Sequence, residues 1–204
     1  MRGGPSRRGR GGASRALDYL EIDKNVDASR VAVIGHSRGG KAALWAGATD
    51  PRFALVSSNC SGSTGAALSR GKTGETITQI NTQFPHWFST KYKSFNNHPE
   101  ALPLDQHWLL AAVAPRLLYV VSAHEDGWAD PESEFLGAVA ASPAYELLGQ
   151  KGLVTSNLAQ TDVPLTEGRI GYHRRTGKHG LTLWDWGRLM DFADAKWRAA
   201  KQRL

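Results

Sequence analysis

The segment that decides the fold runs from Val31 to Trp45 and reads VAVIGHSRGGKAALW. A run of β-branched and small apolar residues leads into a G-x-S-x-G pattern, and residues that favour a helix follow it. In this context Ser37 lies on a strained strand-to-helix turn, with its hydroxyl exposed above the end of a sheet. Gly35 and Gly39 lack a Cβ, so strand and helix can pass close together around the serine. The N–H of Arg38 then faces the point where an oxyanion forms, at the positive end of the helix. The segment therefore predicts a nucleophile, which a solvated Gly-rich turn would not require.

Strand-like and helix-like segments alternate along the rest of the chain. A strand is expected over residues 31–36, and further strands over 53–58, 116–122 and 169–174. Helices are expected over 13–24, 38–50, 106–113, 132–148 (with a break at Pro143) and 183–203. This alternation predicts an α/β architecture, a parallel sheet with helices on both faces.

The candidate catalytic residues follow the strands of this sheet. Sites in parallel sheets form beyond the carboxyl ends of the strands. Ser37 follows the first strand, Asp126 the third and His179 the fourth, which is the Ser…Asp…His order of α/β-hydrolases. Glu125 is the second choice for the acid. Asp130 is the third, because an Asp-Pro pair before a helix is better explained as an N-cap.

The start of the chain differs from the rest. Only one helix and a Gly/Arg-rich stretch precede the first expected strand, whereas α/β-hydrolase sheets have several strands there. We therefore expect residues 1–12 to be a disordered basic leader, and residues 13–204 to be the C-terminal portion of an α/β-hydrolase domain that lacks its N-terminal strands.

Charge and composition exclude several classes of function. The net charge of +6 is concentrated before Asp18, where five arginines stand, and from there on 20 basic residues face 19 acidic ones. A nucleic-acid partner is therefore not expected. No apolar run is long enough to span a membrane, and the leader lacks the apolar stretch of a secretory signal. The single cysteine, Cys60, excludes an internal disulfide. The histidines show no metal-binding spacing, so neither a metal nor another cofactor is expected.

Several motifs together resemble the glucuronoyl esterases, carbohydrate esterase family fifteen, in particular their bacterial branch. The segment Gly35–Lys41, GHSRGGK, is similar to the G-C/H-S-R-x-G-K signature of that family. The similarity continues through six further segments, FPHWF at 84–88, LPLDQH at 102–107, APR at 114–116, WADP at 128–131, IGYH at 170–173 and GKH at 177–179.

The resemblance implies a serine esterase without cofactors that cleaves esters between the glucuronic or 4-O-methyl-glucuronic acid of xylan and lignin alcohols. It implies Ser37 as nucleophile, His179 as base and Arg38 as a contributor to the oxyanion hole. It also implies a secreted or periplasmic enzyme, and we expect a monomer. Two alternatives remain open: another serine hydrolase of the same fold, such as an acetylxylan esterase or an acyl peptidase, and an inactive fragment.

The resemblance also suggests residues that contact the sugar. Lys41 is expected to bind sugar hydroxyls, and Glu75 and Trp128 to line the sugar pocket. One departure concerns the acid, because fungal members place a glutamate where Cys60 stands here. A thiol with an ordinary pKa cannot stabilise an imidazolium as a carboxylate does. The acid must therefore come from elsewhere, and the loop after the third strand, the usual position in hydrolases, favours Asp126 over Glu125.

Overall fold

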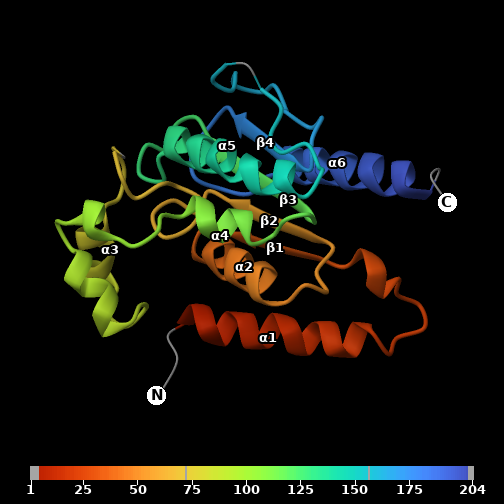
Figure 1. The fold of residues 1–204 in the computed structure, drawn as a ribbon, viewed down its shortest axis with the longest axis horizontal. Coiled ribbons are helices and arrows are strands. Elements are labelled where there is room, and N and C mark those ends of the chain that lie inside the picture. Colours follow the sequence, from red (N-terminus) through yellow and green to blue (C-terminus); the bar gives the residue numbers. More distant parts are fainter. Residues whose placement is uncertain (1–4, 72, 156, 202–204) are drawn as a thin grey trace.

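The computed structural model describes residues 5–71, 73–155 and 157–201. Its centre is a parallel sheet in the order β1 (Ala32–His36), β2 (Leu55–Asn59), β3 (Leu117–Ala123) and β4 (Ile170–Arg175). Because the strands are parallel and follow one another in order, all their carboxyl ends meet at one edge of the sheet (Figure 1).

Helices cover both faces of this sheet. The helices of the described residues are α1 (Pro5–Leu20), α2 (Arg38–Thr49), α3 (Ile77–Gln83), α4 (His107–Ala111), α5 (Pro131–Leu147) and α6 (Leu183–Lys201), and α3 lies to one side of the sheet, against the 3₁₀ helix at Thr90–Phe95 (Figure 1). Three short 3₁₀ helices join them, at Ala28–Arg30, Thr90–Phe95 and Pro99–Ala101. Helices α2, α4 and α5 lie on one face with α1 outside α2, and α6 lies on the other (Figure 1).

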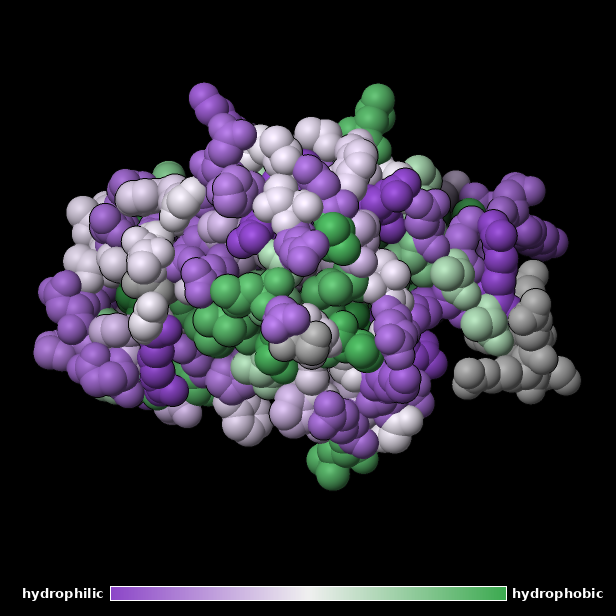
Figure 2. Space-filling model, turned by 90° about the horizontal axis from the view of Figure 1, so that it is seen from above, coloured by the Kyte–Doolittle hydropathy of each residue, from purple (hydrophilic) through white to green (hydrophobic). Residues whose placement is uncertain are grey.

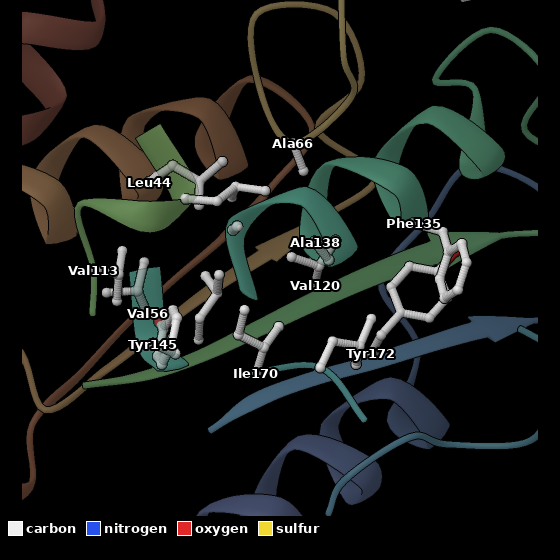
Figure 3. Packing of buried hydrophobic residues seen from close by; sticks show 14 of the residues in the cluster. Leu44, Val56, Ala66, Val113, Val120, Phe135, Ala138, Tyr145, Ile170 and Tyr172 are labelled. Carbon is white, nitrogen blue, oxygen red and sulfur yellow. The ribbon is translucent and has the colours of Figure 1, made fainter. Parts of the chain in front are cut away.

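Alternation along the strands creates two apolar layers. Val120 of β3 points toward α2 and α5, together with Val56, Ile170 and Tyr172 of the neighbouring strands (Figure 3), and Leu118 belongs to the same cluster. The intervening residues of the same strands contact α6, whose apolar positions Leu189, Phe192, Ala193 and Trp197 recur at helical spacing. Burial on both faces explains why β3 begins with a continuous apolar run, Leu117–Val121.

The four expected strands are confirmed to within two residues at each end, and the parallel sheet with helices on both faces is confirmed. Several helices differ from expectation, and α3 was not expected at all. Helix α1 begins at Pro5, so residues 5–12 of the expected disordered leader have a helical backbone, and proline suits the first helical position; residues 1–4 lie outside the described residues. Helix α1 ends at Leu20, which leaves Ile22 76% exposed. Helix α5 runs through Pro143 without a break, because buried Ala141 and Tyr145 hold it on either side.

The long connection between α5 and β4 lies at the top of the view in Figure 1. Figure 2 shows apolar side chains gathered on this side, and Leu158 and Val163 of the connection are 57% and 45% exposed.

Among the described residues, no helix combines the length and apolarity needed to cross a membrane.

Candidate active site

The turn between β1 and α2 gives Ser37 a strained backbone, with φ 56° and ψ −123°. A Cβ on Gly35 would lie 2.0 Å from the carbonyl oxygen of Gly39, so only glycine fits there. At Gly39 itself a Cβ would meet nothing within 4 Å, whereas at Gly40 it would approach Ser61 Cβ to 2.9 Å. The close approach predicted for Gly35 is therefore present, but the second glycine that the packing requires is Gly40 and not Gly39.

The first turn of α2 and an aromatic segment form a pocket beside Ser37. The first hydrogen bond of the helix runs from the N–H of Gly40 to the carbonyl of Ser37, so the N–H of Arg38 precedes the intrahelical bonds. The guanidinium of Arg38 lies 5.8 Å from the ring centre of Trp87, and Phe84 stacks on that ring at 3.9 Å. The pocket has a volume of about 400 Å³ and is lined by Arg38, Gly39, Lys41, Ala42, His86, Trp87 and Phe88.

The loops after β3 and β4 bring a carboxylate and an imidazole together. Asp126 Oδ2 lies 2.6 Å from His179 Nδ1, and the Asp126 side chain is 6% exposed while that of His179 is 44% exposed. The ring of His179 also lies 4.5 Å from that of His36, the residue before Ser37. Glu125 is exposed, and its backbone N–H donates to the carbonyl of Gly177 in the same loop at 3.0 Å. Of the candidate acids, the structure therefore brings Asp126 to His179.

Cys60, at the end of β2, lies against this pair. The residue is 2% exposed and has φ 45°, and its Sγ is 3.9 Å from the carbonyl oxygen of Gly180. Burial raises the pKa of the thiol, and the nearby Glu134 and Asp126 carboxylates raise it further, so the thiol stays protonated. One group of potential metal ligands exists among the described residues, Cys60, Asp126 and His179, with donor atoms within 4.8 Å of one another. Spacing along the sequence does not reveal such a group, because its members follow three different strands.

Lys41 has a structural contact that the sequence did not suggest. Its ammonium donates hydrogen bonds to the carbonyl oxygens of Ser61 and Ser63, in the loop after β2. Lys41 thus ties α2 to that loop, while its side chain also lines the pocket beside Arg38.

Glu75 and Trp128 lie side by side, although 53 positions separate them in the sequence. The N–H of Glu75 donates to the carbonyl of Trp128 at 2.9 Å, Glu75 is 6% exposed and Trp128 is 50% exposed. Asp130 supports this contact, because its Oδ2 accepts a hydrogen bond from the N–H of Thr73 at 2.7 Å. Its Oδ1 accepts from the N–H of Ser133 at 3.1 Å, which confirms the expected N-cap of α5. Burial opposes ionisation of Asp130, but these hydrogen bonds outweigh it and lower its pKa.

A buried carboxylate beneath the site was missed by the sequence reasoning. Glu134 of α5 is fully buried and accepts hydrogen bonds from the N–H of Gly62 at 2.9 Å and the hydroxyl of Ser122 at 2.7 Å. Burial raises its pKa to about 7, and the hydrogen bonds partly offset this effect. Glu134 occupies an ordinary position in a helical pattern, so nothing in the sequence distinguishes it.

A strand-to-helix serine turn, with an acid and a histidine after later strands of one parallel sheet, defines an α/β-hydrolase. Comparison with known proteins agrees with the α/β-hydrolase class and assigns the chain to one family within it. The chain belongs to the glucuronoyl esterase family, because the model described as "Glucuronyl esterase, fungi" matches residues 11–149.

Relatives and solved structures support the assignment. The chain is 51% identical over 183 residues to carbohydrate esterase MZ0003 from an unknown prokaryotic organism, covering 90% of this chain and 42% of that protein. It is 37% identical over 148 residues to the 4-O-methyl-glucuronoyl methylesterase of Hypocrea jecorina, covering 68% of this chain and 32% of that protein. The glucuronoyl esterase structure from Solibacter usitatus superposes with a TM-score of 0.87 at 53% identity, over 92% of this chain and 48% of that one. A CE15 esterase from a marine bacterial metagenome, described as promiscuous, gives a TM-score of 0.89 at 50% identity, over 91% and 46%.

The chain thus spans less than half the length of these relatives. Its identity is higher to the prokaryotic relative than to the fungal one, in agreement with the resemblance to the bacterial branch.

Proposed function

We propose that this chain carries the acid, base and nucleophile of a serine esterase that cleaves glucuronate esters, of the kind that join xylan to lignin alcohols. The observation that carries the proposal is the Asp126–His179 pair, 2.6 Å apart, beside the strained turn that presents Ser37. Membership of the glucuronoyl esterase family supports the same chemistry.

The mechanism takes two steps at the uronate carbonyl. Ser37 Oγ attacks the carbonyl carbon while His179 accepts its proton, and Asp126 holds the ring by its Nδ1–H and stabilises the imidazolium. His179 then gives the proton to the departing alcohol, which leaves a uronoyl ester on Ser37. Water, deprotonated by His179, hydrolyses that ester and restores the serine. The N–H of Arg38, at the start of α2, donates to the oxyanion, and the guanidinium adds positive charge.

Substrate selection follows from the pocket. In a uronate ester the sugar lies on the acyl side, so its hydroxyls stay close to Ser37. We propose that Lys41 binds these hydroxyls from its place in the pocket wall, and that Glu75 and the half-exposed Trp128 also contact the sugar. Aromatic faces such as that of Trp128 suit the apolar face of a sugar.

The test is hydrolysis of benzyl D-glucuronate, compared with p-nitrophenyl acetate. We expect a higher kcat/KM on the uronate, and at least a thousandfold loss in Ser37→Ala. Lys41→Ala is expected to lose uronate turnover and to keep more of its acetate turnover, since acetate offers no hydroxyl to bind. Equal losses on both substrates would assign Lys41 only to holding the loop after β2.

A second candidate function is a broader esterase that also accepts acetyl esters, such as those of acetylxylan. The observation that favours it is the 50% identity to the marine CE15 esterase described as promiscuous. A kcat/KM that is higher on acetylated xylan than on benzyl glucuronate would select this candidate. If the chain hydrolyses neither acetylated xylan nor benzyl glucuronate, it is an inactive fragment.

The proposed substrate also indicates where the protein acts. Glucuronoxylan and lignin lie in plant cell walls, outside the cells that digest them. We therefore propose a secreted or periplasmic protein that works as a monomer on the polymer, without a nucleic-acid or membrane partner.

A further inference from the structure

The loop that carries His179 is held by one arginine at the end of β4. Arg175 is 6% exposed, and its guanidinium donates to the carbonyl oxygens of Thr176 at 3.0 Å, Lys178 at 2.7 Å and Gly180 at 2.9 Å. The three carbonyls lie on both sides of His179. A single planar group therefore fixes the backbone of the whole loop.

Two glycines of the loop leave room for this group. A Cβ on Gly177 would lie 3.0 Å from Arg175 Nη1, and one on Gly180 would lie 3.3 Å from Nη2. Gly177 also has φ 103°, a conformation that residues with a side chain rarely adopt. The Gly-Lys-His-Gly sequence thus fits a backbone that wraps closely around a guanidinium.

A buried polar chain fixes Arg175 in turn. Its Nε donates to Asp185 Oδ2 at 2.9 Å, and the same oxygen accepts the N–H of Thr182 at 2.7 Å. Asp185 Oδ1 lies 2.9 Å from Nε2 of His173, whose Nδ1 lies 2.9 Å from the hydroxyl of Tyr119. Burial lowers the pKa of His173, so the ring is neutral, its Nε2–H donates to Asp185, and Nδ1 accepts from Tyr119. This series of hydrogen bonds runs from Tyr119 in β3 to the loop that carries His179.

Stability alone does not account for this arrangement. Replacing a buried ion pair with apolar side chains often leaves a fold equally stable, because taking two charges out of water opposes their attraction. Here the charges lie beside the apolar cluster between the sheet and α6, which includes Val121 and Leu189. The guanidinium fork instead specifies one conformation of the loop, the one in which His179 Nδ1 meets Asp126.

We infer that Arg175, held by Asp185, is a positioning residue that keeps His179 in line with Asp126 and Ser37. The inference rests on the proposed function, since it takes His179 as the base. A shift of about 1 Å in such a group lowers turnover by about a hundredfold.

The test compares Arg175→Lys with Arg174→Lys in the full chain. Lysine keeps the charge but cannot reach three carbonyls and Asp185 at once. Arg174 is the matched control, because its guanidinium donates to the carbonyl of Ala159 at 2.6 Å, in a different segment. For Arg175→Lys we expect kcat on benzyl glucuronate to fall by about tenfold to a hundredfold with KM within about twofold, faster amide exchange at residues 176–180, and altered ¹⁵N resonances of the His179 ring. For Arg174→Lys we expect kcat, exchange in the loop and ring resonances to stay as in the parent.

A second pair of variants guards against a folding defect. Gly180→Ala keeps both side chains of the Arg175–Asp185 pair and places a Cβ 3.3 Å from Arg175 Nη2, so the guanidinium and the loop must move apart, whereas Gly187→Ala places its Cβ in open space. Gly180→Ala should therefore loosen the loop and lower kcat, and Gly187→Ala should do neither. Parent-like exchange and ring resonances in both Arg175→Lys and Gly180→Ala would overturn the inference. If the parent chain does not hydrolyse the ester, the proposed function fails, and exchange and the ring resonances still decide whether Arg175 positions His179.

Discussion

Replacing Asp126 by asparagine removes the charge beside His179 and keeps the shape of the side chain. Two unit charges about 4 Å apart attract each other by about 4 kcal/mol at an effective dielectric constant of about 20. The His179 side chain is 44% exposed, so solvent screening reduces this attraction to about 2–3 kcal/mol. That loss of imidazolium stabilisation corresponds to about a hundredfold in kcat. The amide can also hold the ring in the wrong tautomer, which extends the expected loss toward about 10⁴-fold.

The assay for Asp126→Asn is steady-state hydrolysis of benzyl glucuronate, with Glu125→Gln measured beside it. We expect Asp126→Asn to lower kcat with KM within about twofold, because the carboxylate acts on the transition state and not on the bound sugar. The Glu125 side chain faces solvent, so Glu125→Gln should match the parent. A parent-like kcat in Asp126→Asn, or a large loss in Glu125→Gln, would refute the reasoning.

Two further predictions concern stability. Gly35→Ala would place a Cβ 2.0 Å from the carbonyl of Gly39, so we expect urea unfolding to show a free energy of unfolding lower by about 3 kcal/mol or more. Gly39→Ala has open space around its Cβ and should change that free energy by less than about 1 kcal/mol. Similar losses in the two variants would contradict the close-approach argument. Glu134 ionises near pH 4.5 when unfolded and near pH 7 when folded, so the folded protein holds a proton in that window that the unfolded chain has lost, and stability falls as pH rises from 4.5 to 7. Between pH 4.5 and 7, the free energy of unfolding of the parent should fall by up to about 3 kcal/mol more than that of Glu134→Gln. If the free energies of the two proteins change in parallel with pH, the raised pKa of Glu134 is wrong.

The sequence was informative where one local pattern determines the outcome. Strand periodicity located all four strands, and the G-x-S-x-G turn located Ser37, because both depend on residues close together in the chain. Parallel connectivity then predicted that Asp126 and His179 would meet, since each follows a strand of the same sheet.

The sequence was uninformative where contacts join distant segments. The loop after β2 is held by Lys41 and Glu134, and the loop that carries His179 by Arg175 and Asp185. Glu134, Arg175 and Asp185 look ordinary in their own helix or strand, and Lys41 was singled out for sugar binding and not for this contact. Helix α3 was missed because its only strong local signal is the capping box at Thr76. The helical start of α1 was missed because glycine and arginine content favours disorder more than it predicts a helix.

The central claim is that Ser37 forms a covalent uronoyl intermediate within this chain. The most direct measurement is mass spectrometry of the protein quenched in acid during turnover of benzyl glucuronate, with peptide mapping of the adduct. The account predicts a uronoyl group on the peptide that contains Ser37. The adduct should decay more slowly in Asp126→Asn, and no adduct should form in Ser37→Ala. Turnover without any adduct, undiminished in Ser37→Ala, would contradict it.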